Sequence, residues 1–99
     1  MTEINLRYDA LLSVQRAFLG EIAQSVRAVA VDTSNKKVVV TIYIEDIISE
    51  DYRYDLSCVE TEVLADFPNN AVEFNIIEDS MGGSKIFPNG EPIYLRKEN

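Results

Sequence analysis

Histidine and tryptophan are absent from this chain of 99 residues, and cysteine occurs once, as Cys58. Without an imidazole base, neither a Ser-His-Asp nor a Cys-His catalytic arrangement can be built. A zinc site made of His and Cys needs at least three such ligands, and this chain supplies a single cysteine, so such a site is excluded. A single cysteine also excludes an internal disulfide. The absence of disulfides is typical of proteins in the reducing cytoplasm. We therefore predict a cytoplasmic protein without a zinc site.

Basic residues and long apolar runs are also scarce. The chain has 17 acidic and 9 basic residues, for a net charge of −8, whereas binding to nucleic acid or to an anionic membrane surface needs a basic footprint. The longest apolar stretch, around Val38–Ile44, is interrupted by Thr41 and falls far short of the roughly 20 residues of a membrane span. Residues 1–5 lack the basic and apolar regions of a secretory signal. We predict that the protein binds neither nucleic acid nor membranes.

Carboxylates are the catalytic resource that these absences leave. Three adjacent pairs of acidic residues occur, at 45–46, 50–51 and 78–79, and adjacent residues on regular structure mostly form solvated surface. No window has the alternating ligands around a glycine that a calcium loop of the EF-hand type requires. We predict no enzymatic activity, no cofactor and no metal site.

The apolar pattern predicts six elements within one domain that covers residues 1–99. Hydrophobic residues at 46% and charged residues at 26% are ordinary values for a globular domain. Helical spacing predicts a first helix at about 6–20, with Gly20 at its end, and a second helix that begins at the Ser49 cap and ends at Pro68. Runs rich in Val and Ile predict strands at 26–32 and 37–44, joined as a hairpin, and further strands at 71–77 and 93–96.

The resulting order, α-β-β-α-β-β, favours an α+β fold. A two-layer sandwich with both helices on one face of an antiparallel sheet buries the apolar stripes most simply. Leu12 and Leu19 widen the stripe of the first helix. Cys58 is expected at the edge of the second stripe, as a small structural residue with no neighbouring base or cation to activate its thiol. The predicted core contains Leu11, Phe18, Val29, Val40, Ile42, Leu56, Val59, Val63, Phe74 and Leu95.

Nearly all of the net charge lies in one segment. Between Glu45 and Asp66 the chain has eight acidic residues and one basic residue, whereas the rest of the chain has nine acidic and eight basic residues. On the second predicted helix, Asp51, Asp55, Glu62 and Asp66 fall within roughly 60° of arc. Like charges at such spacing cost a few tenths of a kcal/mol per pair, so a helix selected only for stability would carry Lys or Arg among them.

This charge distribution predicts an acidic docking surface for a basic partner. Two tyrosines, which are favoured at interfaces, lie at the start of the acidic stripe. The predicted surface comprises Glu45, Asp46, Glu50, Asp51, Tyr52, Tyr54, Asp55, Glu62 and Asp66. Two alternatives stay open. The acidic helix is merely solvated in a small interaction or structural module, or the long loop Glu78–Glu91 carries the recognition instead.

Five stretches of the chain carry a resemblance to a known group of proteins. They are Leu11–Ile22, Val26–Val31, Ile48–Asp51, Glu62–Pro68 and Ile93–Lys97. In these stretches the chain resembles small bacterial immunity proteins of contact-dependent growth inhibition and related polymorphic toxin systems. The resemblance covers most of the chain, and it supplies no functional residues that transfer position by position.

The resemblance implies that the protein binds and neutralises a cognate toxin domain in the cytoplasm of the producing cell. Toxin domains of such systems are often nucleases, whose substrate clefts are basic. An acidic protein suits such a cleft, because opposite charge steers the two proteins together. The expected partner is therefore a basic toxin domain, with nuclease as its expected activity.

Overall fold

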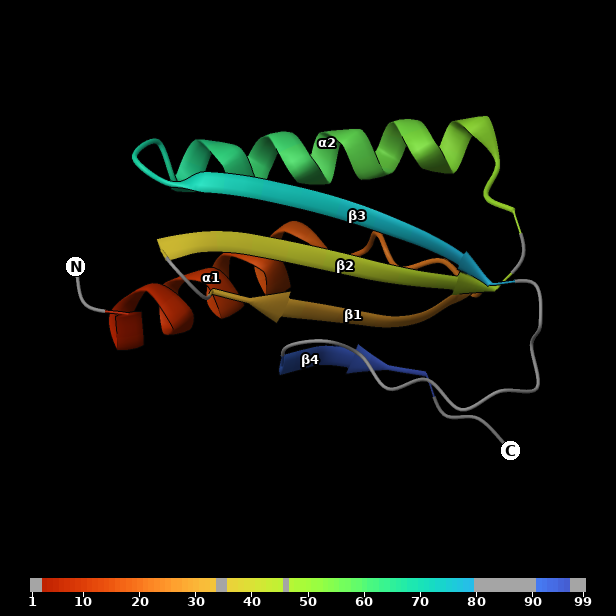
Figure 1. Ribbon diagram of the computed structural model, residues 1–99. Coiled ribbons are helices and arrows are strands. Elements are labelled where there is room, and N and C mark those ends of the chain that lie inside the picture. Colours follow the sequence, from red (N-terminus) through yellow and green to blue (C-terminus); the bar gives the residue numbers. More distant parts are fainter. Residues whose placement is uncertain (1–2, 34–35, 46, 80–90, 97–99) are drawn as a thin grey trace.

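The fold contains two helices and a four-stranded sheet, in the predicted order α-β-β-α-β-β (Figure 1). The computed structural model describes residues 3–33, 36–45, 47–79 and 91–96. The elements are α1 (Glu3–Ala17), β1 (Val26–Asp32), β2 (Lys37–Glu45), α2 (Glu50–Asp66), β3 (Ala71–Asp79) and β4 (Glu91–Leu95). The prediction of an α+β protein is confirmed. Of the long loop Glu78–Glu91, residues 80–90 lie outside the described ranges.

The sheet is mixed, which corrects the prediction of an antiparallel sheet. Its strand order is β3-β2-β1-β4. β1 pairs with β2 and with β4 in the antiparallel direction. β3 pairs with β2 in parallel, from Lys37 opposite Ala71 to Glu45 opposite Asp79. The direction follows from the connection, because α2 returns the chain to the end of the sheet at which β2 began, so that β3 runs the same way as β2.

One hydrophobic cluster joins the helices to the sheet. α1 packs against α2 and β1, and α2 packs against β3, alongside which it runs in Figure 1. The rings of Phe18, a buried member of the cluster, and Phe74, which packs against it, stack with centroids 6.3 Å apart and planes at 8°. The buried members are Leu6, Ala10, Val14, Ala17, Phe18, Val26, Val29, Val31, Val38, Val40, Ile42, Ile44, Ile48, Leu56, Val59, Val63 and Phe67.

Three leucines assigned to apolar stripes or to the core are exposed instead. Leu95 is 58% exposed on β4, and Leu12 and Leu19 are 54% and 77% exposed. The stripe that α1 buries consists of Leu6, Ala10, Val14 and Ala17, whose spacing of four, four and three residues keeps them on one face. Of the remaining predicted core residues, Leu11 and Phe74 are half-buried against the cluster and the others are buried.

The helix ends show the local signals that the sequence predicts. The hydroxyl of Ser49 accepts a hydrogen bond from the backbone N–H of Tyr52 at 3.1 Å and so caps α2. Gly20 has a φ of +78°, in the left-handed region that glycine enters without strain. α1 itself ends at Ala17, earlier than predicted, so Leu19 lies beyond the helix. β3 extends to Asp79 and β4 begins at Glu91, so both strands differ from the predicted ranges.

Two leucines of α2 provide a matched test of this packing. Leu56 is 1% exposed and Leu64 is 43% exposed. We expect Leu56→Ala to lower the free energy of unfolding by about 2–5 kcal/mol, because it leaves a cavity in the core. Leu64→Ala should cost less than about 1 kcal/mol. Urea unfolding followed by circular dichroism measures both. Equal losses would contradict the assignment of the buried face of α2.

Candidate functional site

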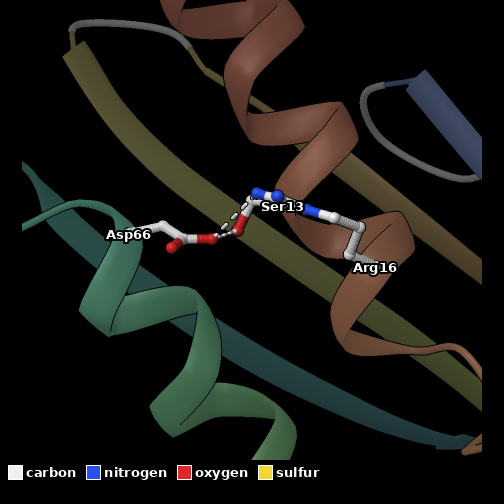
Figure 2. A network of polar contacts seen from close by, with 3 residues as sticks. All are labelled: Ser13, Arg16 and Asp66. Carbon is white, nitrogen blue, oxygen red and sulfur yellow. Dashed lines mark hydrogen bonds and ion pairs between the residues drawn. The ribbon is translucent and has the colours of Figure 1, made fainter.

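The acidic stripe of α2 lies on the side of the helix that faces α1. Leu56, Val59 and Val63 point into the core, and the stripe is displaced from them by about 80° around the helix. At its C-terminal end, Asp66 accepts a hydrogen bond from the Ser13 hydroxyl at 2.6 Å, and a nitrogen of the Arg16 guanidinium lies 3.5 Å from the same carboxylate oxygen (Figure 2). These contacts tie the stripe to α1.

A groove runs between the C-terminal part of α1 and α2. One part of it, with a volume of about 220 Å³, is lined by Arg16, Ala17, Leu19, Glu21, Asp55, Cys58, Val59 and Glu62. A second part is lined by Ser13, Arg16, Ala17, Glu62, Ala65 and Asp66. The two parts share Arg16, Ala17 and Glu62, so they form one continuous feature, which we call the interhelix groove.

Three of the nine predicted surface residues meet in this groove, namely Asp55, Glu62 and Asp66. Glu50, Asp51 and Tyr54 are exposed at the N-terminal end of α2 but do not line the groove. Glu45 lies at the end of β2 and forms an ion pair with Arg96 at 3.0 Å. Asp46 lies outside the described residues. The structure therefore gathers part of the predicted set and separates Glu45 from it.

Tyr52 is turned inward and holds two elements together. Its hydroxyl donates a hydrogen bond to the carbonyl of Glu21 at 2.6 Å and accepts one from the N–H of Ala23 at 3.3 Å. Burial of the ring raises the pKa of Tyr52 above its ordinary 10.0, and the charges of Glu21 and Asp55 add to this effect, whereas the hydrogen bond from Ala23 opposes it. Tyr52 therefore anchors the start of α2 to the segment that follows α1.

Salt bridges join five acidic residues to a cation within the part of the chain that the structure describes. The salt bridges are Arg7 with Glu91, Arg16 with Asp66, Lys37 with Glu73, Arg53 with Glu78, and Arg96 with Glu45. Hydrogen bonds from the Lys37 ammonium and from the Asn75 amide hold the pKa of Glu73 below its ordinary value. Within residues 3–33, 36–45, 47–79 and 91–96, no cation forms a salt bridge with Glu50, Asp51, Asp55 or Glu62. The exposed acids of α2 thus remain available to a cation from another molecule.

Sequence reasoning missed the α1 side of the groove. Ser13, Arg16, Leu19 and Glu21 come from a segment that shows no excess of charge. Ser13 carried the one usable signal, because it is a polar residue 2% exposed beside the apolar stripe of α1, and a buried hydroxyl needs a partner. Asp66, 53 positions away, supplies that partner.

Cys58 was expected at the edge of the core and is instead exposed, where it lines the interhelix groove. It follows Ser57 on the solvent side of α2, roughly a third of a turn from Val59.

Among the described residues, no group of three or more His, Cys, Asp or Glu side chains is placed to hold a metal ion. In the same part of the chain, no helix combines the length and the apolar character needed to cross a membrane.

These features define a class: a small α+β protein with an acidic stripe beside a groove between two helices, in which Asp66 has a cationic partner and Asp51, Asp55 and Glu62 have none among the described residues. Residues 7–98 match the family described as MafI2 immunity protein, and the chain belongs to that family. The match covers both helices of the groove and confirms the resemblance to small bacterial immunity proteins of polymorphic toxin systems. Immunity proteins in general neutralise toxins and are not enzymes. No curated protein matches the chain.

The hydroxyl of Tyr52 offers a test of stability against pH. We expect Tyr52→Phe to lower the free energy of unfolding by about 1–2 kcal/mol at pH 7, because the carbonyl of Glu21 and the N–H of Ala23 lose a partner. A raised pKa means that the fold favours the neutral hydroxyl, so its contribution is complete below pH 10 and is lost as pH rises through the higher folded-state pKa. Urea unfolding of both proteins should show their difference shrinking above about pH 10. A constant difference up to about pH 11 would contradict this role.

Cys58 permits a direct test of its exposure. A thiol reagent should modify it in the native protein, because its side chain is open to solvent. Cys58→Ser should change the free energy of unfolding by less than about 0.5 kcal/mol, since no core packing is lost. Protection of the thiol until the protein unfolds would show that Cys58 is buried after all.

Proposed function

We propose that this protein neutralises a cognate toxin domain by binding it through the acidic side of α2, and that the toxin is a nuclease with a basic substrate cleft. The proposed contact surface centres on Asp51, Asp55, Glu62 and Asp66. Glu50 and Tyr54 contribute at its margin, and Tyr52 holds α2 in place. Glu45, which pairs with Arg96 at the end of β2, and Asp46 are proposed as additional contacts. The encounter takes place in the cytoplasm, where a nuclease delivered by contact-dependent growth inhibition or a related route would meet its nucleic-acid substrate.

The observation that carries the proposal is the uncompensated charge of α2. Glu45, Glu73 and Glu78 on the sheet and Asp66 at the C-terminal end of α2 have cationic partners, whereas Glu50, Asp51, Asp55 and Glu62 have none among the described residues. Solubility alone would be served equally by charges of both signs spread over the surface. A row of one sign along a single helix side, which costs helix stability, is better explained by a partner of the opposite sign.

The carboxylate row is suited to a nuclease cleft for two reasons. Nucleases bind phosphates with Lys and Arg, and the carboxylates of α2 present to those residues the same negative charge as the phosphates do. The field of the row also attracts such a cleft at a distance and so speeds association. A standard interface covers about 800 Å² per partner, which a protein of this size can supply. The protein then inhibits by excluding nucleic acid, and needs no catalytic group.

The test reverses charge in the centre of the row. We expect Asp55→Lys together with Glu62→Lys to weaken binding to the cognate toxin domain by several kcal/mol, because like charges then meet at the interface. Association should slow, while folding should barely change. Raising salt from about 50 to 500 mM should weaken the wild-type complex mainly through the association rate, since screening shortens the reach of the field. Surface plasmon resonance measures these rates.

Glu60 provides a matched control on the same helix. Glu60→Lys changes the net charge as much as Glu62→Lys does, but residue 60 lies about 200° around α2 from residue 62 and away from the groove. Only Glu62→Lys should slow association strongly. Unchanged kinetics in the double variant, with intact circular dichroism, would remove the helix as the docking surface and favour the loop Glu78–Glu91. Digestion of DNA and RNA by the purified toxin domain tests its proposed activity separately.

A further inference from the structure

α1 and the turn that follows it carry large apolar side chains that the fold does not cover. Tyr8 is 63% exposed, and Leu12 and Leu19 are more than half exposed as well. Single exposed leucines are common on protein surfaces, whereas contiguous exposed apolar groups mark interaction sites. We call Tyr8, Leu12 and Leu19 the α1 strip.

The α1 strip leads into the interhelix groove. Tyr8, Leu12 and Arg16 are four residues apart, so they form a line along one side of α1 that turns by about 40° at each step. The last of the three, Arg16, reaches across to Asp66 of α2 (Figure 2). Leu19 lines the groove together with Asp55 and Glu62. The α1 strip therefore adjoins the acidic groove through Leu19, and Arg16 lies between Leu12 and the groove.

We infer that the toxin domain covers the α1 strip and the acidic row in a single contact, with Leu12 and Leu19 as apolar anchors. The inference rests on the proposed function and extends it in two ways. It adds α1 to the contact, and it adds apolar burial to the electrostatic attraction. Interfaces combine a desolvated apolar centre, which holds the complex together, with charged groups that guide its formation. The α1 strip then sets the dissociation rate, and the carboxylates set the association rate.

The charge around the strip selects a basic partner over a second copy of this chain. Glu21, Asp55 and Glu62 line the groove beside Leu19. In a symmetric dimer through this face, the same carboxylates of two molecules would approach one another, and each molecule already carries a net charge of −8. Such like-charge contacts oppose association. A basic toxin surface has no such penalty, because its cations pair with these carboxylates.

The experiment separates the two rates with matched leucine variants. Leu12→Ala combined with Leu19→Ala removes the anchors, and Leu64→Ala combined with Leu95→Ala removes the same number of atoms from exposed leucines elsewhere. We expect the first pair to raise the dissociation rate from the toxin domain by about tenfold or more. Its association rate and salt dependence should stay within about twofold of the wild type. The control pair should change neither rate. Equal urea midpoints for both pairs confirm that the fold is intact.

The outcomes distinguish this inference from the proposed function. If Asp55→Lys with Glu62→Lys slows association but the Leu12 and Leu19 variant dissociates at the wild-type rate, the anchors are refuted and the acidic surface stands. If the acid variant binds normally and the leucine variant dissociates faster, the acidic surface is refuted and the single contact is overturned with it, although the leucines contribute to binding. Sedimentation velocity of the free protein tests whether a second copy of this chain, rather than the toxin domain, covers the α1 strip. A wild-type dimer that the leucine variant abolishes would assign the α1 strip to self-association and overturn the inference.

Discussion

Because β3 pairs with β2 in the parallel direction, the chain must return along the length of the sheet before β3 can begin. α2 makes this return. Its 17 residues span about 26 Å at 1.5 Å per residue, which matches the roughly 30 Å of the nine-residue strands on either side of it. The helix is therefore held along the sheet at both ends, by the Ser49 cap and Tyr52 at its start and by buried Phe67 at its finish. Its rotation about its own axis is settled by Leu56, Val59 and Val63, which must face the core.

That rotation determines what α2 presents to the rest of the molecule. With the apolar residues turned inward, the acidic row lies on the flank next to α1, and the opposite flank lies next to β3, where Arg53 reaches Glu78. α1 approaches this acidic flank with Ala17, Ser13 and Arg16, and the small side chain of Ala17 leaves room for the groove. Ser13 and Arg16 satisfy Asp66 but do not reach Asp55 or Glu62. The packing of α1 against α2 thus provides a partner for Asp66 at one end of the acidic stripe, whereas Asp55 and Glu62 at its centre stay open.

Membership of the MafI2 immunity protein family gives this surface its biological setting. An immunity protein must bind quickly and release slowly, because toxin that escapes harms the cell that makes it. Long-range charge speeds encounter, whereas buried apolar contact slows release, and the two demands call for different side chains. The adjoining carboxylates of α2 and apolar side chains of α1 offer both on one face. Tyr52, which is half-buried and hydrogen-bonded within the protein, supports the start of α2.

The sequence by itself determined the local features of this protein. Period-two and helical spacing, the Ser49 cap and Gly20 located the six elements, and the count of acids located the charged helix, because each signal depends on residues close together in the chain. The parallel direction of β3, the exposure of Leu12, Leu19, Leu95 and Cys58, and the meeting of Ser13 with Asp66 were decided only by the tertiary structure. A strand's direction depends on which neighbour it pairs with, and the burial of a leucine depends on which face of its element is covered. Both are contacts between residues distant in sequence, and no local pattern encodes them.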